Sequence, residues 1–521
     1  MSGTYLDPTP RFGYRSPQTR PLATGVTKLP TTPELREILA HTSWWAEPRT
    51  WVLRDPDLRS AREAPFEYTA GVLEDLTPGG LYLLRGPRRV GKSVEVKKKI
   101  QELIDTGEDP RRIIHVAADQ LTASDLRRVV NAARDLLPDE ERRFWFFDEI
   151  TAITDGWPPA IKWLRDNDGR FARDTVVLTG SSAAKLTEAV KALAGRRGHA
   201  VNSDRVLLPM SFRDFAAARA DAAPDRAGGR PPSDLGPFPV ADLTHSTLAE
   251  AVRVLAPWLP QLVDAWETYL SVGGFPQAIA VHETESGTPG GAFSSAFSAD
   301  FDSGRLRALK QSLLDVIHGE SFRKAAWSLT QTGAFVQRLA RGIASPTNCL
   351  DIATDMGTSA KTVRRRIDAL RESFLVWPCH REHGLRPALR SQEKTYFTDP
   401  IYSSLSPRAP QSSDFGPMSE QQLGMALVRS FARNDPGGYL NFDAVLHHRT
   451  PTRKEIDFVG PGFGGIAIES KYVDGERWRR AIRTMRASRW RGIVATRSAL
   501  DLGDPEVMAV PTAVLAWLIG G

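Results

Sequence analysis

The stretch Leu81–Ser93 constrains this chain more than any other, because an apolar strand runs directly into the pattern G-x-x-x-x-G-K-S. A helix-like stretch, Val94 to Leu103, follows it. This order is typical of a loop whose backbone N–H groups surround phosphates at a helix N-terminus. Gly86 and Gly91 allow backbone angles that larger residues avoid. The motif therefore predicts that the chain binds a nucleoside triphosphate, ATP, together with Mg²⁺.

Individual residues of this loop have separate expected roles. Lys92 reaches the β and γ phosphates, and the Ser93 hydroxyl ligates Mg²⁺. The residues expected to contact the nucleotide are Gly86, Pro87, Arg88, Arg89, Val90, Gly91, Lys92, Ser93 and Val94.

Three later apolar runs have the length of buried strands. They are Ile113–Ala117, Phe144–Phe147 and Thr175–Thr179. Short apolar strands separated by helical stretches indicate a parallel sheet that helices cover on both faces. Two acids end the second of these runs: we expect Asp148 to hold the Mg²⁺ shell and Glu149 to activate the attacking water.

Two more positions belong to the expected ATP site. Ser181 follows the strand Thr175–Thr179 and is placed to contact the γ-phosphate. Arg196, in the run Gly-Arg-Arg, can neutralise transition-state charge within one chain or across a subunit interface. The alternative for Arg196 is a solvated surface arginine.

The chain resembles a large bacterial and archaeal family of AAA+-class ATPases, through the order GPRRVGKS, WFFDEI, LTGSS, LAGRR, LLPMSFRDF and YLSVGGFP. The likeness runs from about Glu34 to the C-terminus and includes the Trp44-Trp45 arm. It implies an α/β fold: a P-loop ATPase with a parallel sheet, then a winged helix and a restriction-nuclease-like α/β domain. Ser93 stands where threonine is commoner and Thr151 where glutamine is frequent, and neither change removes a catalytic group.

A helix-turn-helix pattern lies in the middle of the chain. A short helical stretch, Leu350–Met356, is followed by a turn and by the basic amphipathic stretch Lys361–Leu370. Two strands, Phe374–Trp377 and Lys394–Phe397, enclose a basic loop, as in a winged helix. Two roles stay open: contact with DNA phosphates through Lys361, Arg364 and Arg365, or packing between domains.

An acid, a turn and E-x-K near the C-terminus match the PD-(D/E)XK nuclease pattern. Alternation along Ile466–Lys471 puts Glu469 and Lys471 on one strand face. Asp457, on the neighbouring strand, is expected to hold Mg²⁺ with Glu469, while Lys471 orients water or stabilises charge. Glu420 is a further acid on a preceding helix. Whether this unit cleaves DNA or only binds it stays open.

Composition sets the remaining bounds. The 521 residues carry 68 basic and 62 acidic side chains, so the net charge is +6, which is compatible with nucleic acid but does not require it. The two cysteines lack metal-site and redox spacing, which suits a reducing compartment. Without an apolar run of membrane-spanning length or a signal peptide, we expect a cytoplasmic protein with no membrane partner. A homo-oligomer is possible.

These patterns predict five segments. They are a flexible N-terminal arm with a short helix (1–60), the ATPase core (61–220), a helical region with mobile insertions (221–310), the winged helix (311–402) and the nuclease-like domain (403–521). The insertions are placed at Ala222–Pro239 and Glu283–Ser298, and a linker at Ser403–Pro417.

The leading hypothesis is an ATP-hydrolysing, DNA-associated AAA+-type protein with a metal-dependent nuclease-like domain. One alternative is an ATP-controlled switch that binds DNA or protein without cleaving. Another is a protein-remodelling ATPase whose C-terminal domain grips another protein.

Overall fold

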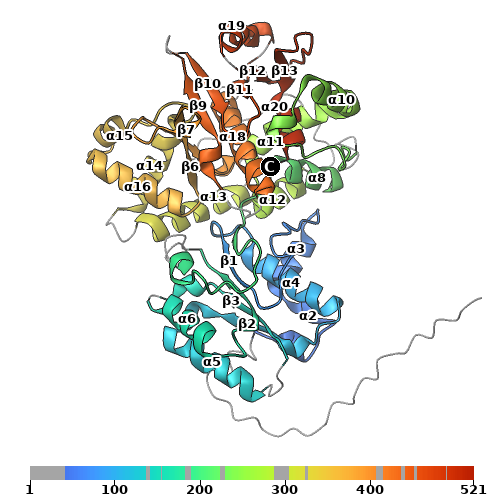
Figure 1. Ribbon diagram of the computed structural model, residues 1–521, viewed down its shortest axis with the longest axis vertical. Helices are drawn as coiled ribbons and strands as arrows, with labels where there is room; N and C mark the ends of the chain where they lie inside the picture. The colour runs from blue at the N-terminus through green and yellow to red at the C-terminus, as the bar shows by residue number, and fades with distance from the viewer. Residues whose placement is uncertain are drawn as a thin grey trace, which may run out of the picture.

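The computed structural model describes residues 41–521 apart from 137–140, 154, 182–188, 223–228, 287–303, 323–326, 406–414, 436–439, 451–453, 474, 489 and 521. Figure 1 shows a lower body, built on one sheet, and an upper body, built on a second. The short helix expected in the N-terminal arm and most of the expected insertion at Glu283–Ser298 lie outside the described residues.

The lower body has a five-stranded parallel sheet in the order β2-β3-β4-β1-β5. Its strands are β1 (Leu81–Arg85), β2 (Ile113–Ala117), β3 (Phe144–Asp148), β4 (Thr175–Thr179) and β5 (Asp204–Val206). Helices α2 (Trp51–Arg54), α3 (Pro56–Glu63) and α4 (Lys92–Asp105) lie on one side, and α5 (Ala123–Leu136) and α6 (Trp157–Asn167) on the other (Figure 1).

Alternation along β1 explains why both faces of this sheet are covered. Tyr82 and Leu84 join the apolar core that includes Val96 of α4, whereas Leu81 and Leu83 join the core that includes α5 and α6. Successive side chains of a strand point to opposite faces, so a strand buried on both is apolar throughout. The predicted α/β fold with a parallel sheet is confirmed.

The tryptophan pair fastens the N-terminal part of the described chain to this body. The indole N–H groups of Trp44 and Trp45 each donate to the carbonyl of Ile113 at 3.0 Å, at the start of β2. Trp44 is buried, and its ring lies 4.9 Å from that of Trp51. The expectation that this arm packs on the ATPase core is confirmed.

The upper body has an eight-stranded mixed sheet in the order β13-β12-β11-β10-β9-β6-β7, with β8 also paired to β6. The strands are β6 (Val376–His383), β7 (Arg386–Pro387), β8 (Lys394–Phe397), β9 (Leu446–Arg449), β10 (Glu455–Val459), β11 (Ile466–Lys471), β12 (Arg491–Thr496) and β13 (Val507–Pro511).

Helices surround this second sheet. In chain order they are α8 (Phe212–Ala222), α10 (His245–Leu255), α11 (Leu259–Val272), α12 (Pro276–Ser286), α13 (Gly304–Ile317), α14 (Leu329–Arg341), α15 (Cys349–Asp355), α16 (Ala360–Glu372), α17 (Pro400–Ser403), α18 (Phe415–Asn434), α19 (Arg480–Arg486) and α20 (Thr512–Ile519). All residues of α20 are buried, and α11 packs against both α18 and α20. No helix among the described residues has the length and apolarity to cross a membrane.

The second sheet crosses the predicted boundary at residues 402 and 403. Strand β6 lies before it and β9 after it, yet they pair in parallel, with His380 opposite Leu446. The predicted linker is also too long, because α18 begins at Phe415 and so includes Pro417. The described part of the insertion Ala222–Pro239 contacts the C-terminal helix, since the Phe238 N–H donates to the Leu518 carbonyl at 2.8 Å.

Candidate nucleotide site and C-terminal acid cluster

The phosphate-loop motif bridges the end of β1 and the start of α4. Gly86 has φ +148° and Gly91 φ +104°, both in the region that favours glycine. A Cβ on Gly86 would lie 2.1 Å from the carbonyl oxygen of Leu207, so the loop packs directly on the chain that leaves β5. A Cβ on Gly91 would have no atom within 4 Å, which leaves open space on that side of the loop.

Lys92 lies inside the loop. Its ammonium donates to the carbonyls of Gly86 and Pro87, both at 2.9 Å, and the residue is buried. Among the other residues predicted to contact nucleotide, Pro87 and Val90 are buried, Arg88 and Arg89 are exposed, and Ser93 and Val94 are half-buried.

Asp148 ends β3 beside the loop. Its Oδ1 accepts hydrogen bonds from the Thr179 hydroxyl and, at 3.1 Å, from the Glu149 N–H, while His115 lies 3.8 Å from Oδ2. Burial by itself raises the pKa of Asp148, but His115 and the hydroxyls of Thr179 and Ser93 together hold that pKa well below its ordinary value. A hydroxyl of the loop and an ionised carboxylate thus lie together, which are oxygen ligands that Mg²⁺ accepts.

Glu149 follows with φ +53°, a left-handed conformation that is uncommon outside glycine. Its Oε1 accepts from the Ser181 hydroxyl at 2.5 Å, from the Ser181 N–H at 3.2 Å and from the Thr151 hydroxyl at 3.2 Å. Arg88 lies 3.8 Å from the same oxygen and donates to the Ser181 hydroxyl at 3.0 Å. The predicted residues Glu149 and Ser181 are therefore in direct contact.

Arg196 lies elsewhere. The carbonyl of its neighbour Arg197 accepts from the Leu81 N–H, at the opposite end of β1 from the phosphate loop. The strand separates the two by about 13 Å, at about 3.3 Å per residue. Arg196 pairs with Asp166 at 3.0 Å. Arg196 therefore lies away from the phosphate loop in this structure, and its transition-state role stays a prediction that favours a subunit interface.

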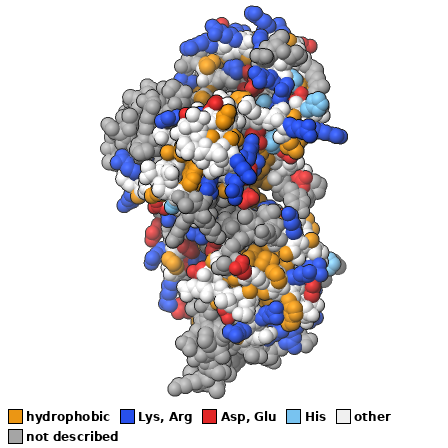
Figure 2. Space-filling view, turned by 90° about the vertical axis from the view of Figure 1, so that its left-hand side faces the viewer, with side chains coloured by type: hydrophobic (Ala, Val, Ile, Leu, Met, Phe, Trp, Pro, Cys, Tyr) orange, Lys and Arg blue, Asp and Glu red, His pale blue; other side chains and the backbone are white. Residues whose placement is uncertain are grey.

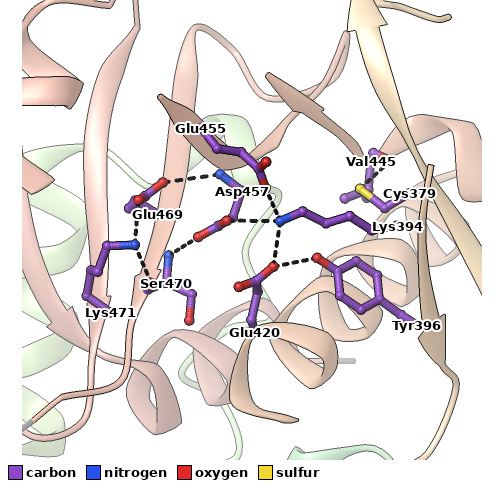
Figure 3. A network of polar contacts seen from close by, with 10 residues as sticks. All are labelled: Cys379, Lys394, Tyr396, Glu420, Val445, Glu455, Asp457, Glu469, Ser470 and Lys471. Carbon is purple, nitrogen blue, oxygen red and sulfur yellow. Dashed lines mark hydrogen bonds and ion pairs between the residues drawn. The ribbon is translucent and has the colours of Figure 1, made fainter. Parts of the chain in front are cut away.

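The C-terminal residues also come together (Figure 3). We call Glu420, Glu455, Asp457 and Glu469 the acid cluster. The Asp457 N–H donates to Glu469 Oε2 at 3.2 Å, and the Ser470 N–H donates to Asp457 Oδ2 at 2.9 Å. The Lys471 ammonium lies 2.6 Å from Glu469 Oε1. The alternation predicted for β10 and β11 therefore has the expected geometric result.

Lys394 is the member of this site that sequence reasoning missed. From β8 its ammonium reaches Glu420 Oε1 at 2.8 Å, Asp457 Oδ1 at 3.2 Å and, more closely still, Glu455. Its side chain is 1% exposed. Alternation puts Lys394 on the same strand face as Tyr396, whose hydroxyl donates to Glu420 Oε1 at 2.5 Å, but the sequence does not indicate which acids this face meets.

Burial and crowding dominate the protonation of the acid cluster. Burial, with the nearby charge of Asp457, raises the pKa of Glu420 to about 7 and that of Glu469 to about 8, although Lys394 and Lys471 oppose these shifts. Burial lowers the pKa of Lys394, but Tyr396 and the surrounding carboxylates outweigh it and hold that pKa well above its ordinary value.

The acid cluster does not fit a divalent metal as it stands. Both oxygens of Asp457 and both of Glu469 already contact a protein donor. Within the described ranges, no three His, Cys, Asp or Glu side chains are grouped in a way that could hold a metal ion. The site therefore has the predicted residues but not the predicted metal geometry.

The helix-turn-helix pattern folds as helices α15 and α16, and β6 and β7 form the hairpin after it. Lys361 and Arg365 are exposed. Arg364 is not a free phosphate contact, because it pairs with Glu393 at 2.5 Å. On this side of the molecule Lys and Arg side chains are interspersed with Asp and Glu (Figure 2).

Comparison with family models divides the chain. Residues 79–216 match a model described as an AAA domain, and residues 290–407 match a domain of unknown function. The first match coincides with the parallel sheet and the phosphate loop. This match and the sheet order together support an AAA-type P-loop ATPase fold for residues 79–216. Domains of this kind bind ATP with Mg²⁺ as a general feature. A comparison with curated proteins finds no match.

Solved structures with a similar course of the chain include a Walker-type ATPase of Pyrococcus abyssi (12% identity, 68% of this chain and 95% of that chain, TM-score 0.38). Others are the Aeropyrum pernix Orc1 protein in complex with DNA (13%, 72% and 96%, TM-score 0.27) and a Thermotoga maritima RuvB variant (11%, 59% and 84%, TM-score 0.26). At these TM-scores the fold assignment rests on the sheet order and the AAA domain.

Proposed function

We propose that this chain hydrolyses ATP at the phosphate loop, associates with DNA, and uses the nucleotide to control its C-terminal unit. The observation that carries the first part is the meeting of Lys92, Asp148, Glu149 and Ser181 at the carboxyl edge of one parallel sheet. Ligands of open α/β sheets bind at this edge.

Each residue has a role in this proposal. Lys92 exchanges its two loop carbonyls for phosphate oxygens. Ser93 and Asp148 would hold Mg²⁺, which neutralises phosphate charge. Glu149 orients and polarises the attacking water once Ser181 and Arg88 release its Oε1 to contact the γ-phosphate themselves. Arg196 contributes only in an oligomer, from a neighbouring copy of the chain.

Hydrolysis is tested by phosphate release from ATP. Lys92→Ala and Glu149→Gln should each lower turnover by about a hundredfold or more, the size of loss found for preorganised electrostatic groups. Arg253→Ala and Glu250→Gln are controls on the exposed face of α10 and should keep full turnover. Unchanged turnover in the first pair would reject ATP hydrolysis at this site.

Association with DNA rests on exposed basic side chains. Helix α16 presents Lys361 and Arg365, and Arg477, Arg480 and Arg483 are exposed at and before α19. Figure 2 shows blue side chains along the upper end of the molecule, where Figure 1 places α19. We propose that α15, α16 and the strands after them act as a winged helix.

A salt series tests this. Fluorescence anisotropy of labelled duplex DNA should give weaker binding at higher salt, and Arg365→Ala should reduce the log–log slope by about 1. Arg253→Ala, which removes an exposed arginine of α10 that pairs with Glu250, is the control. Binding that does not depend on salt would favour the protein-remodelling alternative.

DNA cleavage by the C-terminal unit is the second candidate. The contact of Asp457, Glu469 and Lys471 on adjacent strands favours it, and the order α18-β9-β10-β11-α19-β12 supports a nuclease-like fold. Metal-dependent cutting that disappears in Asp457→Ala would support cleavage. If the wild type binds DNA in an ATP-dependent way but does not cut it, the alternative is favoured: an ATP-controlled switch without nuclease activity.

A further inference from the structure

The acid cluster contains a cation of its own. Lys394 lies among three of the four carboxylates, and its ammonium is the only group drawn in Figure 3 that contacts Glu420, Glu455 and Asp457 together. We propose that Lys394 takes the place of a divalent metal in this cluster, so that Mg²⁺ or Mn²⁺ can enter only after the ammonium has left.

The donor set of the cluster supports this. Glu420 Oε1 receives both Lys394 and the Tyr396 hydroxyl, and Asp457 Oδ1 receives Lys394. Mg²⁺ requires several oxygens that point to one centre at about 2.0–2.1 Å. Here the oxygens point to a nitrogen, and an ammonium has no lone pair with which to join them as a ligand.

The balance of charge supports it as well. Four acidic side chains, not all of them ionised at neutral pH, face the two ammonium groups of Lys394 and Lys471, and all but Glu455 are nearly buried. A buried ammonium requires several partners to offset its lost hydration, and Lys394 has them. A dication placed beside it would meet strong repulsion in a medium of low dielectric constant.

The backbone fixes Lys394 in this position. It begins β8, where it lies opposite Cys379 of β6 in an antiparallel pair, and its ammonium extends across to β10 and α18. Tyr396, two residues later on the same strand, contacts the same Glu420 oxygen. The Lys394 side chain is 1% exposed, so its departure would break its contacts with Glu420, Glu455 and Asp457 together.

Binding of Mn²⁺ to the full-length protein without nucleotide tests the proposal. The free-ion signal in electron paramagnetic resonance reports binding directly, independently of any cleavage. An Asp148→Asn background removes the other candidate metal ligand. In that background we expect no binding that depends on Asp457, so adding Asp457→Asn should change nothing. Adding Lys394→Met should create one Mn²⁺ site per chain, and Asp457→Asn should abolish it.

Two results would overturn the proposal. One is Mn²⁺ binding that requires Asp457 while Lys394 is present; the other is a folded Lys394→Met protein that gains no site. If Lys394→Met does not fold, two proteins that retain Lys394 can still be compared, one with Asp457 and one with Asp457→Asn. Weaker Mn²⁺ binding in Asp457→Asn would overturn the proposal. Lys310→Met, at a buried lysine of α13, controls for loss of any buried ammonium. ATP turnover is measured separately in protein that retains Asp148, so failure of either proposal is distinguishable.

Discussion

The two acidic sites of this chain differ in what neutralises their carboxylates. In the nucleotide site, hydroxyls of Ser93 and Thr179 contact Asp148, and the ammonium of Lys92, in the neighbouring loop, donates to carbonyls. In the acid cluster, Lys394 and Lys471 contact the carboxylates directly. The hydrogen bonds described for the Lys92 ammonium go to loop carbonyls, whereas the two ammonium groups of the second site contact the carboxylates.

This difference separates a site prepared for a cation from one that already holds one. A serine or threonine oxygen keeps lone pairs and can become a ligand when Mg²⁺ arrives, but an ammonium cannot. The same residue types, acid and lysine, therefore have opposite consequences in the two bodies. The consequence depends on where the lysine ammonium lies: in the phosphate loop, as for Lys92, or among the carboxylates, as for Lys394.

The largest expected difference between the sites is in stability. Lys394→Met leaves buried carboxylates without their cation and should cost about 3–5 kcal/mol, as for other broken buried ion pairs. Lys92→Met removes hydrogen bonds to two loop carbonyls, which are neutral acceptors, and should cost about 1–2 kcal/mol. Urea unfolding followed by tryptophan fluorescence measures both. Equal losses would show that Lys394 is no more deeply paired than Lys92.

The second difference is in turnover. Asp148→Asn should lower ATP hydrolysis by about a hundredfold, because the metal shell loses its charged ligand. Asp457→Asn, an equivalent change in the other body, should alter basal turnover by less than about twofold if the acid cluster takes no part in hydrolysis. Phosphate release under saturating ATP gives both values. A large loss in Asp457→Asn would mean that the two sites are coupled.

Local patterns made the first site predictable from sequence. The loop, the strand that ends in Asp148 and the strand before Ser181 are each continuous segments, and parallel strands bring their carboxyl ends to one edge. Asp457 and Glu469 were predictable for the same reason, since one hairpin-like turn joins their strands. Such contacts follow from local periodicity once the sheet is assumed.

Lys394 was harder to place, because its role depends on pairing between distant strands. Strand β8 reaches the acid cluster only through β6, and β6 joins β9 in parallel across the predicted domain boundary. Nothing in the local pattern of Lys394–Phe397 indicates that partner. The position of Arg196 could not be predicted for a similar reason. Its distance from the phosphate loop depends on which end of β1 the segment with Arg196 and Arg197 contacts.

The smallest expected difference is in the pH dependence of stability. The pKa of Glu469 is raised by burial from 4.5 to about 8 and that of Glu420 to about 7. Between pH 4.5 and 8 the unfolded chain therefore releases protons that the folded chain keeps, so these groups make stability fall as pH rises. The pKa of Asp148 is shifted downward, so its contribution is constant over this window and is lost only below its ordinary range.

Urea midpoints at several pH values between about 5 and 8 separate these two cases. Glu469→Gln should make the decline with pH shallower, because the side chain no longer titrates, while Asp148→Asn should leave the slope as in the wild type. An unchanged slope in Glu469→Gln would mean that this carboxyl is ionised throughout the window. The ammonium groups of Lys471 and Lys394 would then lower its pKa by more than burial raises it. The acid cluster would then hold its cations even more tightly, and the contrast with the nucleotide site would be greater.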